Sequence, residues 1–411
     1  MKAGPGRVDA KAAAPASCEG ASSSGWAWQT LVTPDSPVKV PEHFLGMHVS
    51  LHIPAWKRGG RGRIPPPTYP YGYVRTMKVE VDGLEERGFW SNIEFAPGKY
   101  DWRYMDAWME ATAGHPVIWL IFGMPGFYQL YPDEPTRWPS WHGIASPPNE
   151  AGHAALIRYM RAVKARYGER IAAFEAWGEP TFPWTAGATA YDDRWTPAWG
   201  KEHLPDAPQP FFSGSASDLA NIVYTMKQAD LGVPILASGF ADQWKPDQHS
   251  VTRFLNAPVT LPGGSGRGGD HIDALSVHFY DYKRKPSELI DVIEGYRAKL
   301  AASDWPSLPM WLSEVGAGER GSFRANEPAA ATALMRWAML GAALGMQSTL
   351  FYGHVSPPDN VTSLGDPIRG ENTIAALREA ARLNGATICR AALLWDGRVS
   401  LSLAGGETLV R

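Results

Sequence analysis

The chain has 411 residues, of which 44% are hydrophobic and 20% are charged, and its formal net charge is −3. A chain this close to neutrality has no overall field that would attract nucleic acid or an anionic membrane surface, so neither is an expected partner. It contains no run of about 18 apolar residues, so no membrane-spanning helix is expected. The length suits one large α/β barrel, or two to three ordinary domains.

The N-terminal segment is rich in Ala, Gly, Ser and Pro and lacks the apolar core of a signal peptide. This composition predicts a disordered lead over residues 1–25. Cys18 lies in the lead, and Cys389, near the other end, is the second of the 2 cysteines. The two thiols could form one disulfide between the ends of the chain or could both stay free, and the cysteine count does not decide between these alternatives.

Beyond the lead, short apolar runs bounded by turn residues alternate with longer segments of helical period. Predicted strands occupy residues 44–52, 73–81, 116–124, 171–177, 234–240, 273–280, 309–316 and 347–354. Predicted helices occupy residues 103–113, 150–167, 216–231, 286–302, 327–344 and 371–384. Between the first two strands a Pro- and Tyr-rich loop replaces the helix. This alternation favours one (β/α)8 TIM barrel over residues 41–384 rather than a doubly wound sheet.

The last segment of the chain has a different pattern. In residues 385–411, apolar and polar residues alternate, and Asp-Gly and Gly-Gly turn signals interrupt them. This pattern predicts short antiparallel strands. Residues 26–40 contain a similar strand-like run that could pair with them. The fold class is therefore α/β, a TIM barrel with a small β appendage formed by the termini.

Active-site residues of such a barrel lie at the C-terminal ends of its strands, and two glutamates occupy such positions. Glu179 follows the fourth strand in "FEAWGEP", and Glu314 ends the seventh strand in "WLSEVG". Two carboxyl groups facing a common space are what glycosidic bond cleavage requires, one as proton donor and the other as nucleophile. The alternative is that both are solvated loop acids, but a pair at the ends of two apolar strands favours the catalytic interpretation.

Glu175 lies within the apolar run that Glu179 follows. Residues 175, 177 and 179 share one face of a strand, so Glu175 is expected inside the barrel below Glu179. A charge buried there needs a cationic or hydrogen-bonding partner, and Arg75 on the second strand is the candidate.

These motifs resemble those of a known group. "FEAWGEP" resembles the acid/base strand, W-N-E-P, of the retaining (β/α)8 glycoside hydrolases of the 4/7 clan, clan A, and "WLSEVG" resembles their nucleophile strand. The stretch "FWSNIEFAPGKYDW" after the second strand is similar to one in glycoside hydrolase family 39 and its bacterial exopolysaccharide-hydrolase relatives. "GMPGFY" and "SVHFY" fit the same pattern, and the resemblance spans about residues 44–384.

The resemblance implies a retaining glycosidase that cleaves O-glycosidic bonds of an oligo- or polysaccharide, with Glu179 as general acid/base and Glu314 as nucleophile. It implies a carbohydrate partner. No cofactor is expected, and the expected location is periplasmic or secreted. Since His48 and His52 do not form the H-x-H pair of metal-dependent barrels, no metal is expected. The implied substrate-binding residues are His48, Arg75, Trp177, Gly178, Trp184, His278 and Tyr280. Tyr280 would hydrogen-bond the nucleophile, and Arg75 would support the carboxylates from below.

The chain departs from the resemblance at Gly178, where the clan usually has an Asn that contacts the sugar 2-hydroxyl. A subsite that accepts a different or bulkier C2 substituent would explain this change. So would a non-hydrolytic carbohydrate-binding barrel serving polysaccharide assembly or export, which is the alternative function. Trp184, Phe127 and Tyr128 are further candidates for stacking against a sugar ring.

Overall fold

The computed structural model describes Cys18 and residues 27–53, 72–81, 88–132, 145–180, 212–241, 250–281, 285–317, 327–356 and 371–411. The rest of the predicted lead at 1–25 lies outside the described residues, and so does Trp184. Within the described part of the chain, no helix is both long enough and apolar enough to cross a membrane.

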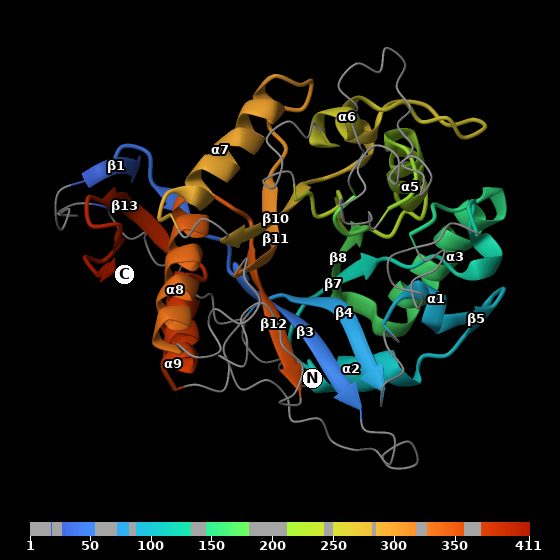
Figure 1. Ribbon diagram of the computed structural model, residues 1–411, viewed down its shortest axis with the longest axis horizontal. Coiled ribbons are helices and arrows are strands. Elements are labelled where there is room, and N and C mark those ends of the chain that lie inside the picture. The colour runs from blue at the N-terminus through green and yellow to red at the C-terminus, as the bar shows by residue number, and fades with distance from the viewer. Residues whose placement is uncertain are drawn as a thin grey trace, which may run out of the picture.

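A barrel of parallel strands occupies the centre of the molecule (Figure 1). Its strands are β3 (Leu45–Ile53), β4 (Val74–Val81), β7 (Val117–Ile121), β8 (Ile171–Ala176), β9 (Ile235–Leu236), β10 (Leu275–Asp281), β11 (Met310–Ala317) and β12 (Thr349–Ser356). They form one 8-stranded sheet in the order β10-β11-β12-β3-β4-β7-β8-β9. Parallel bridges from Leu236 to Ala274 and from Phe240 to Val277 join the two end strands and close the ring. The predicted TIM barrel is therefore confirmed.

Helices surround the barrel (Figure 1). The predicted helical segments form α2 (Arg103–Ala111), α3 (Glu150–Tyr167), α5 (Ala216–Lys227), α7 (Glu288–Ala301), α8 (Glu327–Ala343) and α9 (Glu371–Ala380). Sequence patterning did not predict α1 (Trp90–Ile93), α6 (Ser250–Asn256), or the hairpin of β5 (Glu94–Ala96) and β6 (Lys99–Tyr100). In α3, the Asn149 side chain caps the first turn, and Gly168 ends the helix with φ +58°.

The appendage is a separate antiparallel sheet. It consists of β1 (Ala27–Val32), β2 (Val38–Lys39), β13 (Thr387–Leu394), β14 (Val399–Leu403) and β15 (Thr408–Val410). Strands β1, β13, β14 and β15 follow one another in the sheet, and β2 also pairs with β13. The two ends of the chain therefore meet in one sheet, as predicted for the appendage.

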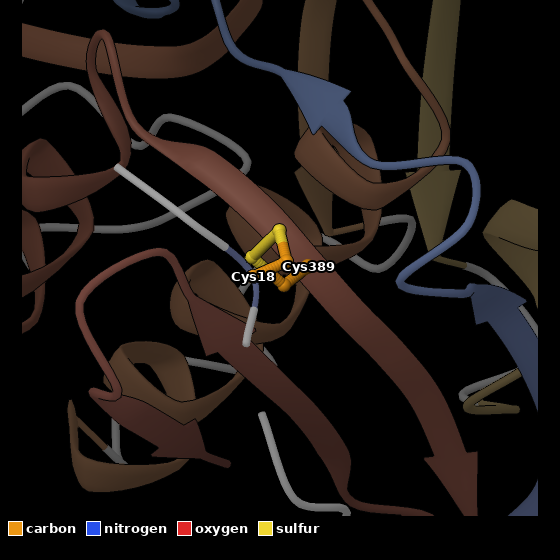
Figure 2. The surroundings of a disulfide bond; sticks show 2 residues. All are labelled: Cys18 and Cys389. Carbon is orange, nitrogen blue, oxygen red and sulfur yellow. A yellow bond between two sulfur atoms is a disulfide. The ribbon is translucent and has the colours of Figure 1, made fainter. Parts of the chain in front are cut away.

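A disulfide joins Cys18 to Cys389 on β13 (Figure 2). The two Cα atoms are 5.4 Å apart, within the range that a disulfide spans without backbone movement. Of the two alternatives left open by the cysteine count, the structure contains the bridge. Because it closes a loop of nearly the whole chain, it restricts the unfolded state strongly in the chain-entropy account.

The barrel interior is layered, and the alternation of residues along each strand sets the layers. The lowest layer is apolar and consists of Tyr73, Ile118, Ala173, Leu236, Ala274, Trp311 and Leu350. Two residues further along β4 is Arg75, and two residues further along β8 is Glu175. The strand period therefore places a charged layer directly above the apolar plug, which explains why apolar strands carry buried charges.

Candidate active site

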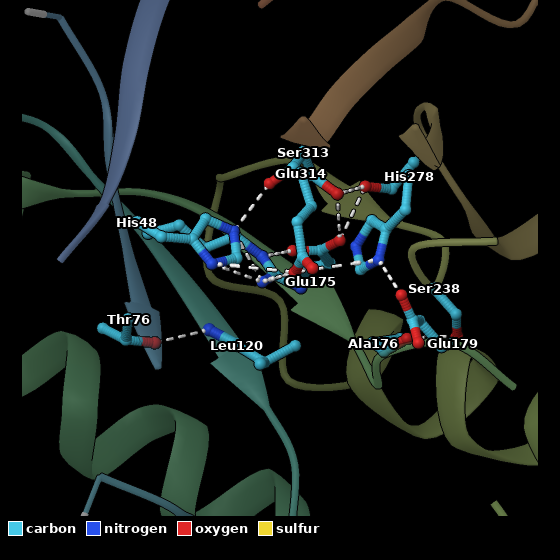
Figure 3. Close-up of polar contacts among 12 residues, drawn as sticks. His48, Thr76, Leu120, Glu175, Ala176, Glu179, Ser238, His278, Ser313 and Glu314 are labelled. Atoms are coloured by element: carbon cyan, nitrogen blue, oxygen red, sulfur yellow. Dashed lines mark hydrogen bonds and ion pairs between the residues drawn. The ribbon is translucent and has the colours of Figure 1, made fainter. Parts of the chain in front are cut away.

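The charged layer is built around an ion pair between Arg75 and Glu175. Figure 3 shows Glu175 between His48 and His278. Arg75 Nε donates to Glu175 Oε2, and both side chains are almost completely buried. Glu175 Oε1 accepts hydrogen bonds from Ser276 Oγ at 2.6 Å and from Ser313 Oγ at 2.8 Å. Both carboxylate oxygens are thus satisfied, as a buried charge requires. The predicted pairing of Glu175 with Arg75 is confirmed, whereas sequence reasoning missed both serines.

His48 on β3 lies beside this layer, with its Nδ1 3.7 Å from Glu314 Oε2. Its Nε2 donates to the Ser313 carbonyl at 2.7 Å and lies 2.8 Å from Arg75 Nη1. Burial, followed by the charges of Arg75 and His278, holds the pKa of His48 well below its ordinary value. His48 is therefore neutral near pH 7 and acts as a packed, hydrogen-bonded element of the barrel floor.

A β-bulge in β11 brings Glu314 into the barrel. Along β10 and β11, Val277 pairs with Leu312, but the next residue, His278, pairs with Glu314, so Ser313 is an extra residue. A bulge of this kind re-aims the side chains that follow it. As a result, two consecutive residues both reach the interior: Ser313 bonds Glu175, and Glu314 accepts a hydrogen bond from the Tyr280 hydroxyl.

Glu179 is presented by an unusual backbone at the end of β8. Trp177 and Glu179, on either side of Gly178, have φ of +66° and +46°, in the left-handed region that non-glycine residues rarely adopt. Two hydrogen bonds fix this segment, from Trp177 N to the Ile121 carbonyl at 2.8 Å and from Glu179 N to the Gly239 carbonyl at 3.0 Å. Strained backbone of this kind persists only where the surroundings hold it, and it is concentrated at functional sites.

The two carboxylates come together around one imidazole. A ligand atom from each of Glu179, His278 and Glu314 lies within 4.8 Å of the others. His278 Nδ1 is 2.9 Å from Glu179 Oε1 and 3.7 Å from Glu314 Oε2. The side chains of Glu179 and Glu314 are 14% and 8% exposed, so both can be reached from solvent. The same three side chains are close enough together to hold a metal ion. Their closest contact, between His278 and Glu179, is explained by a hydrogen bond and does not require a metal.

The ionisable groups of the site have pKa values shifted by different causes. Burial, together with the charge of Glu179, raises the pKa of Glu314, although His278, Arg75 and the Tyr280 hydrogen bond partly oppose this rise. Burial lowers the pKa of His278, but the nearby carboxylates of Glu314 and Glu179 outweigh it, so the net pKa is raised. Burial and the Glu314 charge raise the pKa of Tyr280 well above its ordinary value. Tyr280 therefore stays protonated and acts as a hydrogen-bond donor.

Gly239 determines how closely the imidazole can approach the backbone. A Cβ atom at this position would lie 1.9 Å from His278 Nε2, so any side chain here would displace the ring. The same segment is anchored by the Ser238 hydroxyl, which donates to the Ala176 carbonyl. Sequence reasoning did not select Gly239 because a glycine near the end of an apolar run usually indicates only a turn.

The predicted sugar-contacting aromatic residues differ in how far their side chains are exposed to solvent. Trp177 was expected to shape the sugar subsite, but it is fully buried between Phe122 and Phe212, so it backs the site and offers no face to a ligand. Tyr128 was a stacking candidate, but it is also buried, with its hydroxyl on Glu94. Phe127 is 41% exposed and remains a stacking candidate.

Tyr352 on β12 is a residue that sequence reasoning missed. Its ring lies 5.3 Å from the His48 ring and 6.2 Å from the Tyr280 ring, centroid to centroid, and the side chain is half-buried. Its position in "LFYGH", in the C-terminal half of the strand predicted over 347–354, is the signal that could have identified it.

The family-like stretch after β4 forms a structural support. Glu94 is buried and accepts hydrogen bonds from Trp90 Nε1 at 2.6 Å, from Gly98 N at 2.7 Å and from the Tyr128 hydroxyl at 3.1 Å. Its carboxylate thereby ties the loop that follows β4 to the loop that follows β7. The observed role of this motif is therefore to hold these two loops together.

No protein-family profile matches the chain, and no curated protein matches it by sequence. Solved structures do match it. A β-xylosidase of glycoside hydrolase family 39 from Caulobacter crescentus is 16% identical, with a TM-score of 0.55 over 90% of this chain and 79% of that one. A glucosidase from Croceicoccus marinus is 14% identical, with a TM-score of 0.53 over 91% and 77%. A family 39 glycoside hydrolase from Bacteroides cellulosilyticus is 17% identical, with a TM-score of 0.54 over 90% and 69%. At these identities the likeness establishes a shared fold.

Proposed function

We propose that the protein is a retaining glycoside hydrolase that cleaves O-glycosidic bonds of an oligo- or polysaccharide by double displacement. The observation that carries the proposal is that carboxylate oxygens of Glu179 and Glu314 lie within 4.8 Å of each other at the C-terminal ends of barrel strands. Retaining enzymes hold their two carboxyl groups about 5–5.5 Å apart, whereas inverting enzymes separate them by about 6.5–9.5 Å to admit a water. The structural neighbours described as a glucosidase and a β-xylosidase support the same assignment.

In the first step, a Glu314 carboxylate oxygen attacks the anomeric carbon while protonated Glu179 gives its proton to the departing glycosidic oxygen. The glycosidic bond breaks, and a covalent glycosyl ester forms on Glu314. In the second step, Glu179 takes a proton from water, and the resulting hydroxide attacks the same carbon and frees Glu314. The hydrogen bond from Tyr280 holds the Glu314 carboxylate in place for attack.

The proposal is tested by screening aryl glycosides and bacterial and plant polysaccharides, with product sizes read by mass spectrometry. We expect release of aglycone or of shortened oligosaccharides from at least one substrate. Glu314→Gln should lose that release and keep its fold. If no substrate in the panel is cleaved but soluble polysaccharide is still bound, the result contradicts hydrolysis and favours a carbohydrate-binding barrel.

Replacing Tyr280 with Phe should change the pH profile in a defined direction. The Tyr280 hydrogen bond lowers the pKa of Glu314, so its removal raises that pKa further. Glu314 must be ionised to attack, so the acidic limb of the kcat/KM profile should move to higher pH. A hydrogen bond to a charged group contributes about 1.5–3 kcal/mol, so kcat should fall roughly 10- to 150-fold.

The matched control for this change is Tyr296→Phe. Tyr296 is also buried, but its hydroxyl donates to the Phe240 carbonyl at 3.0 Å, outside the carboxylate cluster. The control should lose stability without moving the acidic limb. An unmoved limb in Tyr280→Phe would show that this tyrosine does not set the ionisation of Glu314.

Substituting Asn for Gly178 should alter specificity. Among the described residues, no heavy atom lies within 4 Å of a Cβ built at this position, and the φ of Gly178 is not left-handed, so a side chain can begin here without backbone strain. We expect kcat/KM to rise roughly 2- to 12-fold for substrates with a free 2-hydroxyl, which corresponds to one added hydrogen bond. Substrates with a bulky C2 substituent should lose activity by a similar factor.

Gly295→Asn controls for the Gly178 change, because Gly295 on α7 also has open space around its Cβ but lies in an outer helix. It should leave both kinetic constants unchanged for both substrate classes. If Gly178→Asn affects the two substrate classes equally, residue 178 does not face the C2 position of the sugar.

We also propose that the protein works in an oxidising compartment, in the periplasm or outside the cell. The Cys18–Cys389 disulfide supports this location, because structural disulfides persist in oxidising environments and are rare in reducing ones. The proposal predicts that protein recovered from its native cells carries no titratable thiol until it is unfolded and reduced.

A further inference from the structure

Two exposed tryptophans lie together on the appendage, outside the carboxylate site. Trp28 is 51% exposed and Trp395 is 70% exposed. Their ring centroids are 6.2 Å apart, and the ring planes are inclined by 32°. In the described part of the chain, this is the one ring pair in which both aromatic side chains are exposed. Figure 1 shows β1, which carries Trp28, and β13, which ends just before Trp395, at the periphery of the molecule.

Local backbone features hold both indoles at the surface. The register of β1 on β13 shifts between Ala27 and Gln29, so Trp28 lies at an irregularity and has no cross-strand partner in that register. Trp395 begins the tight turn between β13 and β14. Gly397, with φ +80°, donates its N–H to the Leu394 carbonyl at 3.0 Å, which fixes that turn.

The surroundings of the rings are polar and electrically balanced. Asp396 and Arg398 in the same turn form an ion pair at 2.6 Å, so the turn carries no net charge. Gln29 and Thr30, next to Trp28 on β1, are exposed. The surface therefore combines two flat apolar faces with neighbouring hydrogen-bonding groups, and the two charges of the turn that carries Trp395 cancel.

The size of this surface decides between classes of ligand. A tryptophan side chain offers roughly 150–250 Å² of contact area, so the exposed fractions of the two indoles amount to about 200–300 Å². A stable protein interface needs about 800 Å² on each partner, which is far more than this pair supplies. A carbohydrate chain needs little more than flat rings for the apolar faces of its sugars and polar groups for its hydroxyl edges.

We propose that Trp28 and Trp395 form an accessory platform that binds a neutral stretch of a polysaccharide chain, with one sugar ring against each indole. The choice of carbohydrate as ligand rests on the proposed glycosidase function. Holding the polymer on the appendage raises its effective concentration near the barrel, so the platform lowers KM for polymers. It leaves turnover of small aryl glycosides unchanged.

The test is affinity electrophoresis in gels that contain xylan, mixed-linkage β-glucan, galactomannan or hydroxyethylcellulose. Glu314→Gln is the background, so that the gel polysaccharide is not degraded. We expect at least one polysaccharide to retard the protein. Adding Trp395→Ala or Trp28→Ala should raise the dissociation constant roughly tenfold, since each indole covers about 50–60 Å² of apolar sugar surface. Trp395→Tyr, which keeps an aromatic ring, should retain most of the retardation.

The matched control is Phe95→Ala, which removes a side chain that is 64% exposed on β5 rather than on the appendage. It should leave the retardation unchanged. The proposal is overturned if no polysaccharide retards the protein, or if the tryptophan and phenylalanine variants are retarded equally. It is also overturned if sedimentation velocity finds a dimer that Trp395→Ala dissociates, because a second copy of the chain would then be the occupant.

Parallel assays separate this proposal from the proposed function. In the otherwise unchanged protein, both tryptophan variants should cleave aryl glycosides with unaltered kcat and KM. Retardation that depends on the tryptophans, without any hydrolysis by the unsubstituted protein, would refute the glycosidase proposal and leave the platform standing. Hydrolysis by the unsubstituted protein without tryptophan-dependent retardation would refute the platform and leave the glycosidase proposal standing.

Discussion

Replacing Glu314 with Gln should lower kcat by about 10⁴-fold or more while the fold is kept. The amide cannot form the glycosyl ester, and removal of a catalytic nucleophile in another hydrolase costs on the order of 10⁶-fold. Glu314 is buried with a raised pKa, so loss of its charge should not destabilise the barrel. The measurement is steady-state hydrolysis of the best aryl glycoside, with thermal unfolding followed in parallel.

Glu179→Gln provides the comparison that separates the two roles. General acid–base catalysis raises the rate roughly 10²–10⁴-fold. Protonation of the leaving group by Glu179 is not needed for leaving groups that depart without a proton. We therefore expect a large loss on natural glycosides and a smaller one on activated aryl glycosides. Glu294→Gln, an exposed glutamate on α7, should change neither rate. If both catalytic-site variants keep more than about a tenth of the activity, neither carboxylate performs the chemistry.

Breaking the buried ion pair of the barrel floor should have the largest effect on stability. Removing one partner of such a pair leaves an uncompensated charge and costs about 3–5 kcal/mol. In Glu175→Ala, Arg75 would lose the carboxylate that its Nε contacts, and Ser276 and Ser313 would lose their common acceptor. We expect a decrease of this size in the free energy of unfolding, measured by urea denaturation.

Two variants calibrate that result. Glu175→Gln preserves the shape and an acceptor for the serines but removes the charge, so its loss should be smaller. Glu294→Ala breaks an exposed ion pair with Arg297, whose side chains are 53% and 39% exposed, and should cost less than about 1 kcal/mol. A loss in Glu175→Ala no larger than that in Glu294→Ala would mean that the charged layer does not hold the barrel together.

Strand periodicity made much of the fold predictable. Each predicted strand appears, because an apolar run bounded by turn residues has few other stable arrangements in a chain with alternating helices. The strand predicted over 234–240 is regular only over Ile235–Leu236. Beyond it, Gly239 and Phe240 form isolated bridges to Gly178 and Val277, which a local pattern cannot anticipate. The helices α1 and α6 were missed because one- to two-turn helices owe their stability to packing.

The site could be predicted only in part, for a related reason. Period-two alternation was sufficient to place Glu175 beside Arg75 inside the barrel. It was not sufficient for Glu314, which faces the interior because Ser313 is an extra residue in the β11 register. Nor does a local pattern reveal the left-handed backbone at Trp177 and Glu179, because contacts from neighbouring strands fix it.

Trapping of the glycosyl-enzyme tests the central claim most directly. The protein is incubated with an activated 2-deoxy-2-fluoro glycoside of the sugar identified by the screen, digested, and analysed by peptide mass spectrometry. Double displacement predicts one sugar adduct on the peptide that contains Glu314, and no adduct in Glu314→Gln. An adduct on the Glu179 peptide would reverse the two roles. Hydrolysis that inverts the anomeric configuration without any adduct would contradict the retaining mechanism.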